Sequence, residues 1–215
     1  MVYCVLTPTL AKSNSNGRQG LPSFKHRFMY SFSVLASSDI ASDAGIEIVF
    51  RTFANFHHDL TPKHKKKSKL IFIDKGGYAL TAIQWAEQLE IKTHVQVLNW
   101  KRIDAIREAY AEATLFLLPS RSEIEEIIVQ ALSKGIPILS YQEEVQMHYI
   151  DHTCGTLIDY YSKEQSIEDF ANVMRMLYFD PEACKMLKKG ALTKHTNQVN
   201  WEQTPKKLSP SSIVS

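Results

Sequence analysis

A short stretch between two apolar runs carries the residues best suited to binding a ligand. It reads LPSRSEIEEIIVQALSKGIPILS and places Ser120, Arg121 and Glu123 directly after the run that ends at Pro119. A guanidinium offers a planar fork of donors that suits phosphate, and a carboxylate accepts hydrogen bonds from sugar hydroxyls. The pattern indicates an anion- or sugar-binding turn at a helix N-terminus, where the helix dipole favours negative charge. A simple helix cap with Arg121 and Glu123 in solvent is an equally good interpretation.

A second candidate turn is DKGG, which also follows an apolar run. Gly76 and Gly77 allow a tight turn that brings backbone N–H groups close to a ligand, although such a pair is more often structural. The spacing differs from the G-x-G-x-x-G of dinucleotide folds, and G-x-x-x-x-G-K-[ST] is absent. Both observations argue against a nicotinamide enzyme and a P-loop ATPase.

Metal and thiol chemistry find little support. The three cysteines are far apart and form no C-x-x-C pair: Cys4, Cys154 and Cys184. Neither a disulfide framework nor a zinc site is therefore expected, and a reducing cytosol fits best. His148 and His152 have the spacing of metal ligands but lack an evident third partner. His57 and His58 fall on a predicted helix, where we expect surface positions. We predict no metal and no cofactor.

The bulk composition describes an ordinary globular chain. Its 215 residues are 44% hydrophobic and 22% charged, with a formal net charge of +2, which is too balanced to indicate nucleic-acid binding. The basic run Pro62–Lys69 is interpreted as a solvated loop. No window has the ~18 consecutive apolar residues of a membrane span, and the N-terminus makes a poor signal peptide. These features predict a soluble, cytoplasmic protein.

Hydrophobic patterns predict alternating strands and helices between residues 28 and 158. The predicted strands are 27–38, 69–74, 93–100, 114–120, 136–140 and 154–159, and the predicted helices 46–60, 78–91, 102–113, 125–134, 166–178 and 180–191. Ser166 resembles the start of a capping box. The alternation predicts an α/β, Rossmann-like parallel sheet with helices on both faces. In such folds ligands bind beyond the carboxyl ends of the strands, where SSDIASDAG, DKGG and PSRSE lie.

Several stretches, taken in order, resemble the C-terminal donor-binding domain of GT-B glycosyltransferases of family 4. They include KLIFIDKGGYALTAIQWAEQLEIKTHVQVLNW, IDAIREAYAEATLFLLPSRSE, QALSKGIPILSY and HTCGTLID. The resemblance covers about residues 28–208, half of a GT-B fold. Residues 1–27 are then an irregular N-terminal segment, and residues 209–215 a disordered tail. The resemblance implies a retaining enzyme that binds a nucleoside-diphosphate sugar without a metal.

The resemblance also implies roles for individual residues. It places the donor against Gly76, Gly77, Ser120, Arg121, Glu123 and Gln130. Glu123 stands where the family has an acidic residue on the sugar. Gln130 stands, one residue short of the family spacing, where a second Glu holds the ribose; an amide can also bond to a ribose.

Two departures from the family pattern weaken the expected donor site. Ile124, Glu125 and Glu126 replace a Gly-Phe-Gly, which sets two carboxylates toward the phosphates. Ser38 and Ala44 stand where the family has an Arg and a Lys that neutralise the diphosphate. Ser38 and Lys75 are the candidate phosphate contacts that remain, with Arg121 as a possible substitute for the missing cations.

Three hypotheses follow. The chain is a glycosyltransferase donor domain, either a fragment or a degenerate copy, whose acceptor domain is absent. Alternatively it is a non-catalytic GT-B-like scaffold or a partner subunit of an active, paralogous glycosyltransferase chain. An unrelated flavodoxin-like binding domain is the third. In each case we expect the isolated chain to be inactive.

Overall fold

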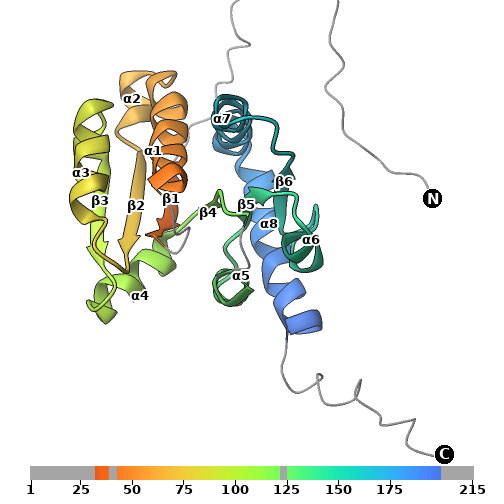
Figure 1. The fold of residues 1–215 in the computed structure, drawn as a ribbon. Coiled ribbons are helices and arrows are strands. Elements are labelled where there is room, and N and C mark those ends of the chain that lie inside the picture. Colours follow the sequence, from red (N-terminus) through yellow and green to blue (C-terminus); the bar gives the residue numbers. More distant parts are fainter. Residues whose placement is uncertain (1–31, 39–42, 122–124, 200–215) are drawn as a thin grey trace, which may run out of the picture.

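The computed structural model describes residues 32–38, 43–121 and 125–199. Expectations for residues outside these ranges, including the role of Glu123, lie outside the described residues. Within them, the chain forms one six-stranded parallel sheet with helices on both faces (Figure 1). The predicted fold class is therefore confirmed.

The sheet winds outward in two directions from its centre. Its strands are β1 (Phe32–Ser37), β2 (Ser68–Asp74), β3 (Val95–Asn99), β4 (Leu115–Leu118), β5 (Ile138–Tyr141) and β6 (Gly155–Ile158). Their order is β3-β2-β1-β4-β5-β6, and every neighbouring pair is parallel. The chain thus moves from β1 to β3 on one side and resumes at β4 on the other.

The helices form a layer on each face of the sheet. They are α1 (Asp43–His58), α2 (Pro62–Lys65), α3 (Ala79–Gln88), α4 (Ile103–Glu112), α5 (Glu125–Ser133), α6 (Glu144–Tyr149), α7 (Lys163–Phe179) and α8 (Pro181–Lys194). Because parallel crossovers are right-handed, reversing the winding direction places α1 and α3 on one face and α4 and α5 on the other. The long helix α7 packs against α1, and α8 packs against α5.

The centre of the sheet is covered on both sides, as its sequence predicts. The residues of β1, β4 and β5 are all buried, which fits strands with no polar interior. Phe32 of β1 packs against Phe56 of α1 and Tyr178 of α7, at ring-centroid distances of 5.4 and 5.5 Å. These contacts join the first strand to helices far apart in the sequence.

The basic run predicted as a loop is partly helical. Pro62–Lys65 forms the single turn α2, since proline is favoured at the first helical position, where its missing N–H costs nothing. Ser68 then begins β2. No residue of α2 is buried, so this part of the run is solvated as predicted, but it is helical rather than a loop.

The surface position predicted for His57 is also wrong. Only 3% of His57 is exposed; its ring stacks on Phe53, and its Nδ1 lies 2.8 Å from Ser68 Oγ. His57 follows Phe53 by four residues, so it lies on the apolar stripe of α1. A polar partner on β2 makes this burial tolerable.

The cap predicted for the penultimate helix lies one turn earlier. Ser162, not Ser166, caps α7, and its hydroxyl accepts a hydrogen bond from Gln165 N. Ser166 is buried inside the helix and donates to Ser162 O at 2.7 Å. The polar residues 162–165 carry no apolar periodicity, so the pattern marked the start of the buried face rather than the start of the helix.

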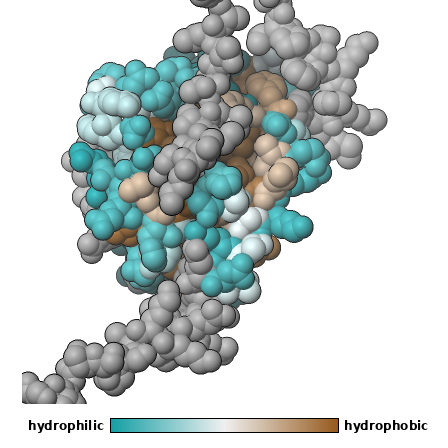
Figure 2. Space-filling model, turned by 90° about the vertical axis from the view of Figure 1, so that its right-hand side faces the viewer, coloured by the Kyte–Doolittle hydropathy of each residue, from teal (hydrophilic) through white to brown (hydrophobic). Residues whose placement is uncertain are grey.

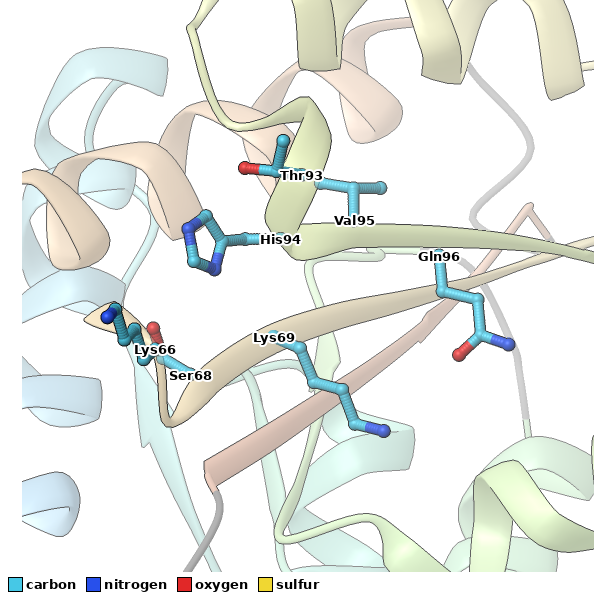
Figure 3. A pocket seen from close by; sticks show the side chains of 7 residues that line it. All are labelled: Lys66, Ser68, Lys69, Thr93, His94, Val95 and Gln96. Atoms are coloured by element: carbon cyan, nitrogen blue, oxygen red, sulfur yellow. The ribbon is translucent and has the colours of Figure 1, made fainter. Parts of the chain in front are cut away.

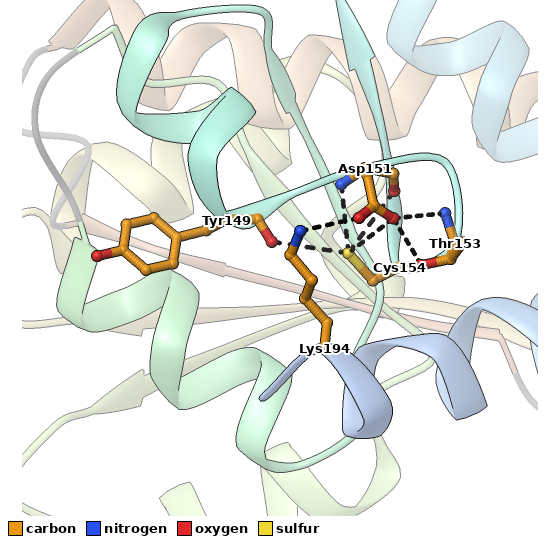
Figure 4. A network of polar contacts seen from close by, with 5 residues as sticks. All are labelled: Tyr149, Asp151, Thr153, Cys154 and Lys194. Carbon is orange, nitrogen blue, oxygen red and sulfur yellow. Dashed lines mark hydrogen bonds and ion pairs between the residues drawn. The ribbon is translucent and has the colours of Figure 1, made fainter. Parts of the chain in front are cut away.

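A polar network fastens the end of α8 to the loop before β6 (Figure 4). Asp151 accepts from Lys194 Nζ at 2.8 Å and from Thr153 N at 2.9 Å. Burial by itself raises the pKa of Asp151, but the bonds from Lys194 and Thr153 outweigh it and lower that pKa to about 2. Cys154 is fully buried, and burial raises the pKa of its thiol, so it is a packing residue here.

The side of the molecule that carries β6, α6 and α8 has hydrophobic patches set among hydrophilic residues (Figure 2). Among the exposed apolar side chains of the described residues are Met147 of α6 and Met186 of α8. In the described ranges, no helix combines the length and the apolar character needed to cross a bilayer.

Gly190→Ala should destabilise the protein by about 2 kcal/mol, as other overpacked sites do. A Cβ at Gly190 would lie 1.8 Å from the carbonyl oxygen of Thr153, which is backbone and cannot move aside alone. Gly76→Ala is the matched control, because a Cβ there meets nothing within 4 Å. Urea denaturation measures both. Equal stabilities of the two variants would contradict the tight packing of α8 on this loop.

Acid should destabilise the fold through His57. Burial, aided by the positive charges of His94, Lys65 and His58, lowers the pKa of His57 to about 4. Between pH 6.5 and 4 the unfolded chain therefore binds a proton that the folded chain does not, so stability is full above pH 6.5 and falls as the pH drops toward 4. His57→Gln should flatten the decline between pH 7 and 5 by about 1–2 kcal/mol. Urea denaturation at pH 7 and at pH 5 measures the free energy of unfolding of both proteins. An equal loss of stability between the two pH values in His57→Gln and in the unchanged protein would contradict this expectation.

Candidate functional site at the carboxyl edge of the sheet

The reversal of strand order between β1 and β4 defines the candidate site. In open α/β sheets the loops after these strands diverge to opposite faces, and a crevice opens between them. The described residues at the carboxyl edge are Ser38 after β1, Asp74–Gly77 after β2, Ser120 and Arg121 after β4, Glu143 after β5 and Tyr160 after β6. Most of the residues singled out in the sequence therefore share one edge.

The DKGG turn is held by a carboxylate. Asp74 is largely buried, and its Oδ1 accepts hydrogen bonds from Gly76 N at 3.1 Å and Tyr78 N at 3.0 Å. Gly77 has a φ of 91°, a conformation that side chains rarely adopt. Gly77 is thus required to turn the chain into α3, and the Gly76 N–H is used within the turn.

The first two loops of the site are bonded to each other. The Ser38 hydroxyl accepts from Lys75 N at 2.7 Å, and Ser38 is 5% exposed. This bond sets Ser38 and the backbone of Lys75 side by side at the carboxyl ends of β1 and β2. Both residues are candidate phosphate contacts, and the structure brings them together.

Arg121 is positioned by residues from two other loops. Its Nε donates to Glu143 Oε1 at 2.7 Å, and its guanidinium carbon lies 4.9 Å from the centre of the Tyr160 ring. The hydrogen bond and the charge of Glu143 raise the pKa of Arg121. In the described part of the chain, its two terminal Nη groups have no hydrogen-bond partner, and the side chain is 59% exposed. Arg121 is therefore oriented by the hydrogen bond at its Nε, while its two Nη groups stay open to a ligand.

The turn that carries Arg121 is supported from below. The carbonyl of Ser120 accepts from Gln146 Nε2 at 3.0 Å, and the Ser140 hydroxyl donates to Leu118 O at 2.8 Å. Gln146 and Ser140 are both buried. These bonds satisfy backbone carbonyls where β4 ends and make the start of the loop rigid.

The first described turn of α5 is acidic. Glu125 and Glu126 are exposed, and Glu125 accepts a hydrogen bond from the Tyr149 hydroxyl. That bond, together with burial, raises the pKa of Tyr149 to about 12. Carboxylates at a helix N-terminus are stabilised by the helix dipole, and their charge opposes the binding of an anion there.

Gln130 lies apart from the other candidate residues. It is exposed on α5, and its Oε1 accepts from the Tyr110 hydroxyl of α4 at 3.1 Å. Its side chain is thus engaged with the neighbouring helix. Its predicted contact with a ribose stays a prediction.

Sequence reasoning missed three residues of this edge: Asp74, Glu143 and Tyr160. Asp74 had a local signal, because Asp before Lys-Gly-Gly is typical of a side chain that bonds the backbone two residues on. For Glu143 and Tyr160 the only signal in the sequence was their place after a predicted strand. Each follows a strand of the predicted sheet, but their contact with Arg121 depends on the order in which those strands pair.

The chain belongs to the family of glycosyl transferases group 1, whose model matches residues 28–194. No curated protein sequence matches this chain.

Solved structures of glycosyltransferases share the fold. The chain matches the pneumococcal O-GlcNAc transferase GtfA, solved with UDP and GlcNAc, at 17% identity and a TM-score of 0.64, over 77% of this chain and 32% of GtfA. It matches a mutant of S. aureus TarM, also solved with UDP, at 14% identity and a TM-score of 0.68, over 90% of this chain and 37% of TarM. The chain thus spans well under half the length of either protein.

One matching structure is itself a single domain. The C-terminal domain of the group 1 family protein LpcC from Francisella tularensis matches at 12% identity and a TM-score of 0.63, over 80% of this chain and 87% of that domain. Likeness at such identities establishes the fold alone, a GT-B-type half with a Rossmann-like sheet.

Asp74→Ala should cost about 2 kcal/mol of stability, because the N–H groups of Gly76 and Tyr78 lose a charged acceptor. Asp74→Asn retains an oxygen at Oδ1 and should cost less than half as much. Urea denaturation of both variants tests the proposal that the turn depends on an acceptor. If Asn were as damaging as Ala, the negative charge rather than the acceptor would hold the turn.

Proposed function

We propose that this chain is the donor-binding domain of a glycosyltransferase that uses a nucleoside-diphosphate sugar. The observation that carries the proposal is Arg121, whose open guanidinium fork is held by Glu143 and Tyr160 at the switch point of the sheet. Family membership supports the reaction class. The bound UDP named for GtfA and TarM supports a nucleotide diphosphate as the ligand.

The proposed division of roles combines the geometry of the described residues with the resemblance to the family. The Nη groups of Arg121 bind the diphosphate as a bidentate pair, which compensates in part for the missing basic residues of the first loop. Ser38 and Lys75 contact the same group from β1 and β2, and Gly77 lets the backbone approach. Glu123 on the sugar and Gln130 on the ribose complete the donor set. The reaction would retain stereochemistry and require no metal or other cofactor.

The acceptor side would come from elsewhere. Because the chain spans 32% of GtfA and 37% of TarM but 87% of the LpcC domain, a further domain or a separate chain is proposed to bind the acceptor. The isolated 215 residues are then expected to bind a donor without transferring sugar. A cytoplasmic location remains part of the proposal.

A second candidate is a non-catalytic scaffold or partner subunit of an active glycosyltransferase. Glu125, Glu126 and Glu143 favour it, since three carboxylates lie at the edge where a diphosphate would bind. Like charges at such a site oppose binding. In this case the carboxyl edge would contact a protein instead of a nucleotide.

Calorimetric titration with UDP separates the two candidates. We expect saturable binding that weakens about tenfold or more in Arg121→Ala, because a charge-assisted hydrogen bond contributes about 1.5–3 kcal/mol. Arg107→Ala is the matched control, since Arg107 is an exposed arginine paired only with Asp104 on the same helix in the described residues. Absence of UDP and GDP binding by the folded protein would overturn the donor-domain proposal and favour the scaffold.

A further inference from the structure

A cavity opens at the amino edge of the sheet, opposite the candidate donor site, where β2 and β3 begin (Figure 3). It has a volume of about 440 Å³ and is lined by Lys66, Ser68, Lys69, Thr93, His94, Val95 and Gln96. The strand β2 is seven residues long, so at about 3.3 Å per residue this cavity lies roughly 20 Å from the DKGG turn. It is therefore separate from the proposed donor site.

The lining of this amino-edge cavity is cationic. Lys66 and Lys69 supply its positive charge, and none of its lining residues is acidic. Lys69 is paired with Glu112 of α4 at 2.6 Å. Lys66 is exposed and has no ion pair within the described residues. The same segment adds Lys63 and Lys65, so several positive charges gather around the cavity.

Its floor is ordered by buried hydrogen bonds. The Ser68 hydroxyl donates to Lys65 O at 3.1 Å and must therefore accept from His57 Nδ1 at 2.8 Å. The neutral His57 ring lies 4.2 Å from the His94 ring, between centroids. His94 therefore packs against a ring, His57, that hydrogen bonds hold in place. It lies on a short segment, the 3-10 turn Lys92–His94. In Figure 3, Lys66, Ser68 and the His94 ring come together at one end of the cavity.

Hydroxyl and amide groups complement the cations. Thr93 and Gln96 are exposed at the cavity, and both side chains can donate hydrogen bonds. Ammonium groups, a hydroxyl and an amide around one concave surface suit an anion with several acceptor oxygens. An anion of this kind would also relieve the mutual repulsion of the lysines, which a solvated basic face would leave in place.

We propose that the amino-edge cavity is a binding site for a phosphate group, with Lys66 and His94 as its principal contacts. The phosphate belongs either to a free phosphorylated small molecule or to a phosphomonoester lipid headgroup. The site does not depend on donor binding at the carboxyl edge. Its volume exceeds that of phosphate alone, so the group attached to the phosphate also has room.

Titration of the full chain with inorganic phosphate, followed by amide NMR at constant ionic strength, tests the site. We expect saturable shifts centred on residues 93–96 and about fivefold weaker binding in Lys66→Gln, the effect of one exposed ion pair of about 1 kcal/mol. Lys63→Gln is the matched control, because Lys63 carries the same charge in the same basic run but does not line the cavity. Lys66 is exposed, so folding should be unaffected, and thermal unfolding of each variant verifies this.

Two results would overturn the proposal. The first is an absence of saturable shifts at residues 93–96. The second is equal weakening by Lys63→Gln and Lys66→Gln, or none by Lys66→Gln, which would show a diffuse response to charge. Arg121→Ala should leave phosphate binding at this cavity unchanged, while Lys66→Gln should leave UDP binding unchanged, so failure of either site is distinguishable from failure of the other.

Vesicles distinguish the two sources of phosphate. Phosphatidylcholine vesicles with phosphatidate carry a phosphomonoester, and vesicles with phosphatidylglycerol carry a phosphodiester. Cosedimentation with the phosphatidate vesicles alone, lost in Lys66→Gln, assigns the site to a lipid headgroup. Saturable binding of inorganic phosphate without cosedimentation assigns it to a soluble phosphorylated ligand.

Discussion

The parallel pairing of β1 with both β2 and β4 is the constraint on which the rest of the structure depends. Because β1 lies at the centre and is fully buried, the chain must wind outward in both directions, and right-handed crossovers then send the helices of the two halves to opposite faces. The gathering of these loops at the carboxyl edge is a consequence of that reversal rather than of any particular loop sequence. The candidate residues come from the ends of five strands and could share one site only in this strand order.

Within that edge, electrostatics explain how a reduced set of charges could still serve an anionic ligand. Arg121 is the only cation that the structure holds in place by a described carboxylate and a described ring, Glu143 and Tyr160. Holding a long side chain in one orientation lowers the entropy lost when it binds a ligand. The same carboxylate partly neutralises it, and Glu125 and Glu126 add negative charge nearby. The site is therefore ordered but has more described carboxylates than cations, whereas the amino-edge cavity has two lysines and no acidic residue in its lining.

The elements that the sequence predicted well are those whose signal is local. The apolar runs of β2, β4 and β5 and the helix that ends before Gly135 appear at nearly the predicted positions, because a strand buried on both faces must be continuously apolar. The errors arose where a tertiary contact reversed a local tendency. His57 is buried because Ser68 supplies its partner, and α7 begins at Ser162 because capping, not apolar periodicity, decides where a helix starts.

The sequence by itself determined the fold class and which loops lie at the carboxyl edge, since hydrophobic period and turn residues act over a few neighbouring positions. It also carried the residues that resemble the glycosyltransferase family. Only the tertiary structure decided that Glu143 and Tyr160 hold Arg121, that Asp74 uses the Gly76 N–H, and that Gln130 bonds to Tyr110. It also brought the start of β2 and the start of β3 together around a cationic cavity. Such contacts join residues from separate elements, and their geometry depends on strand order and helix packing, which no local pattern encodes.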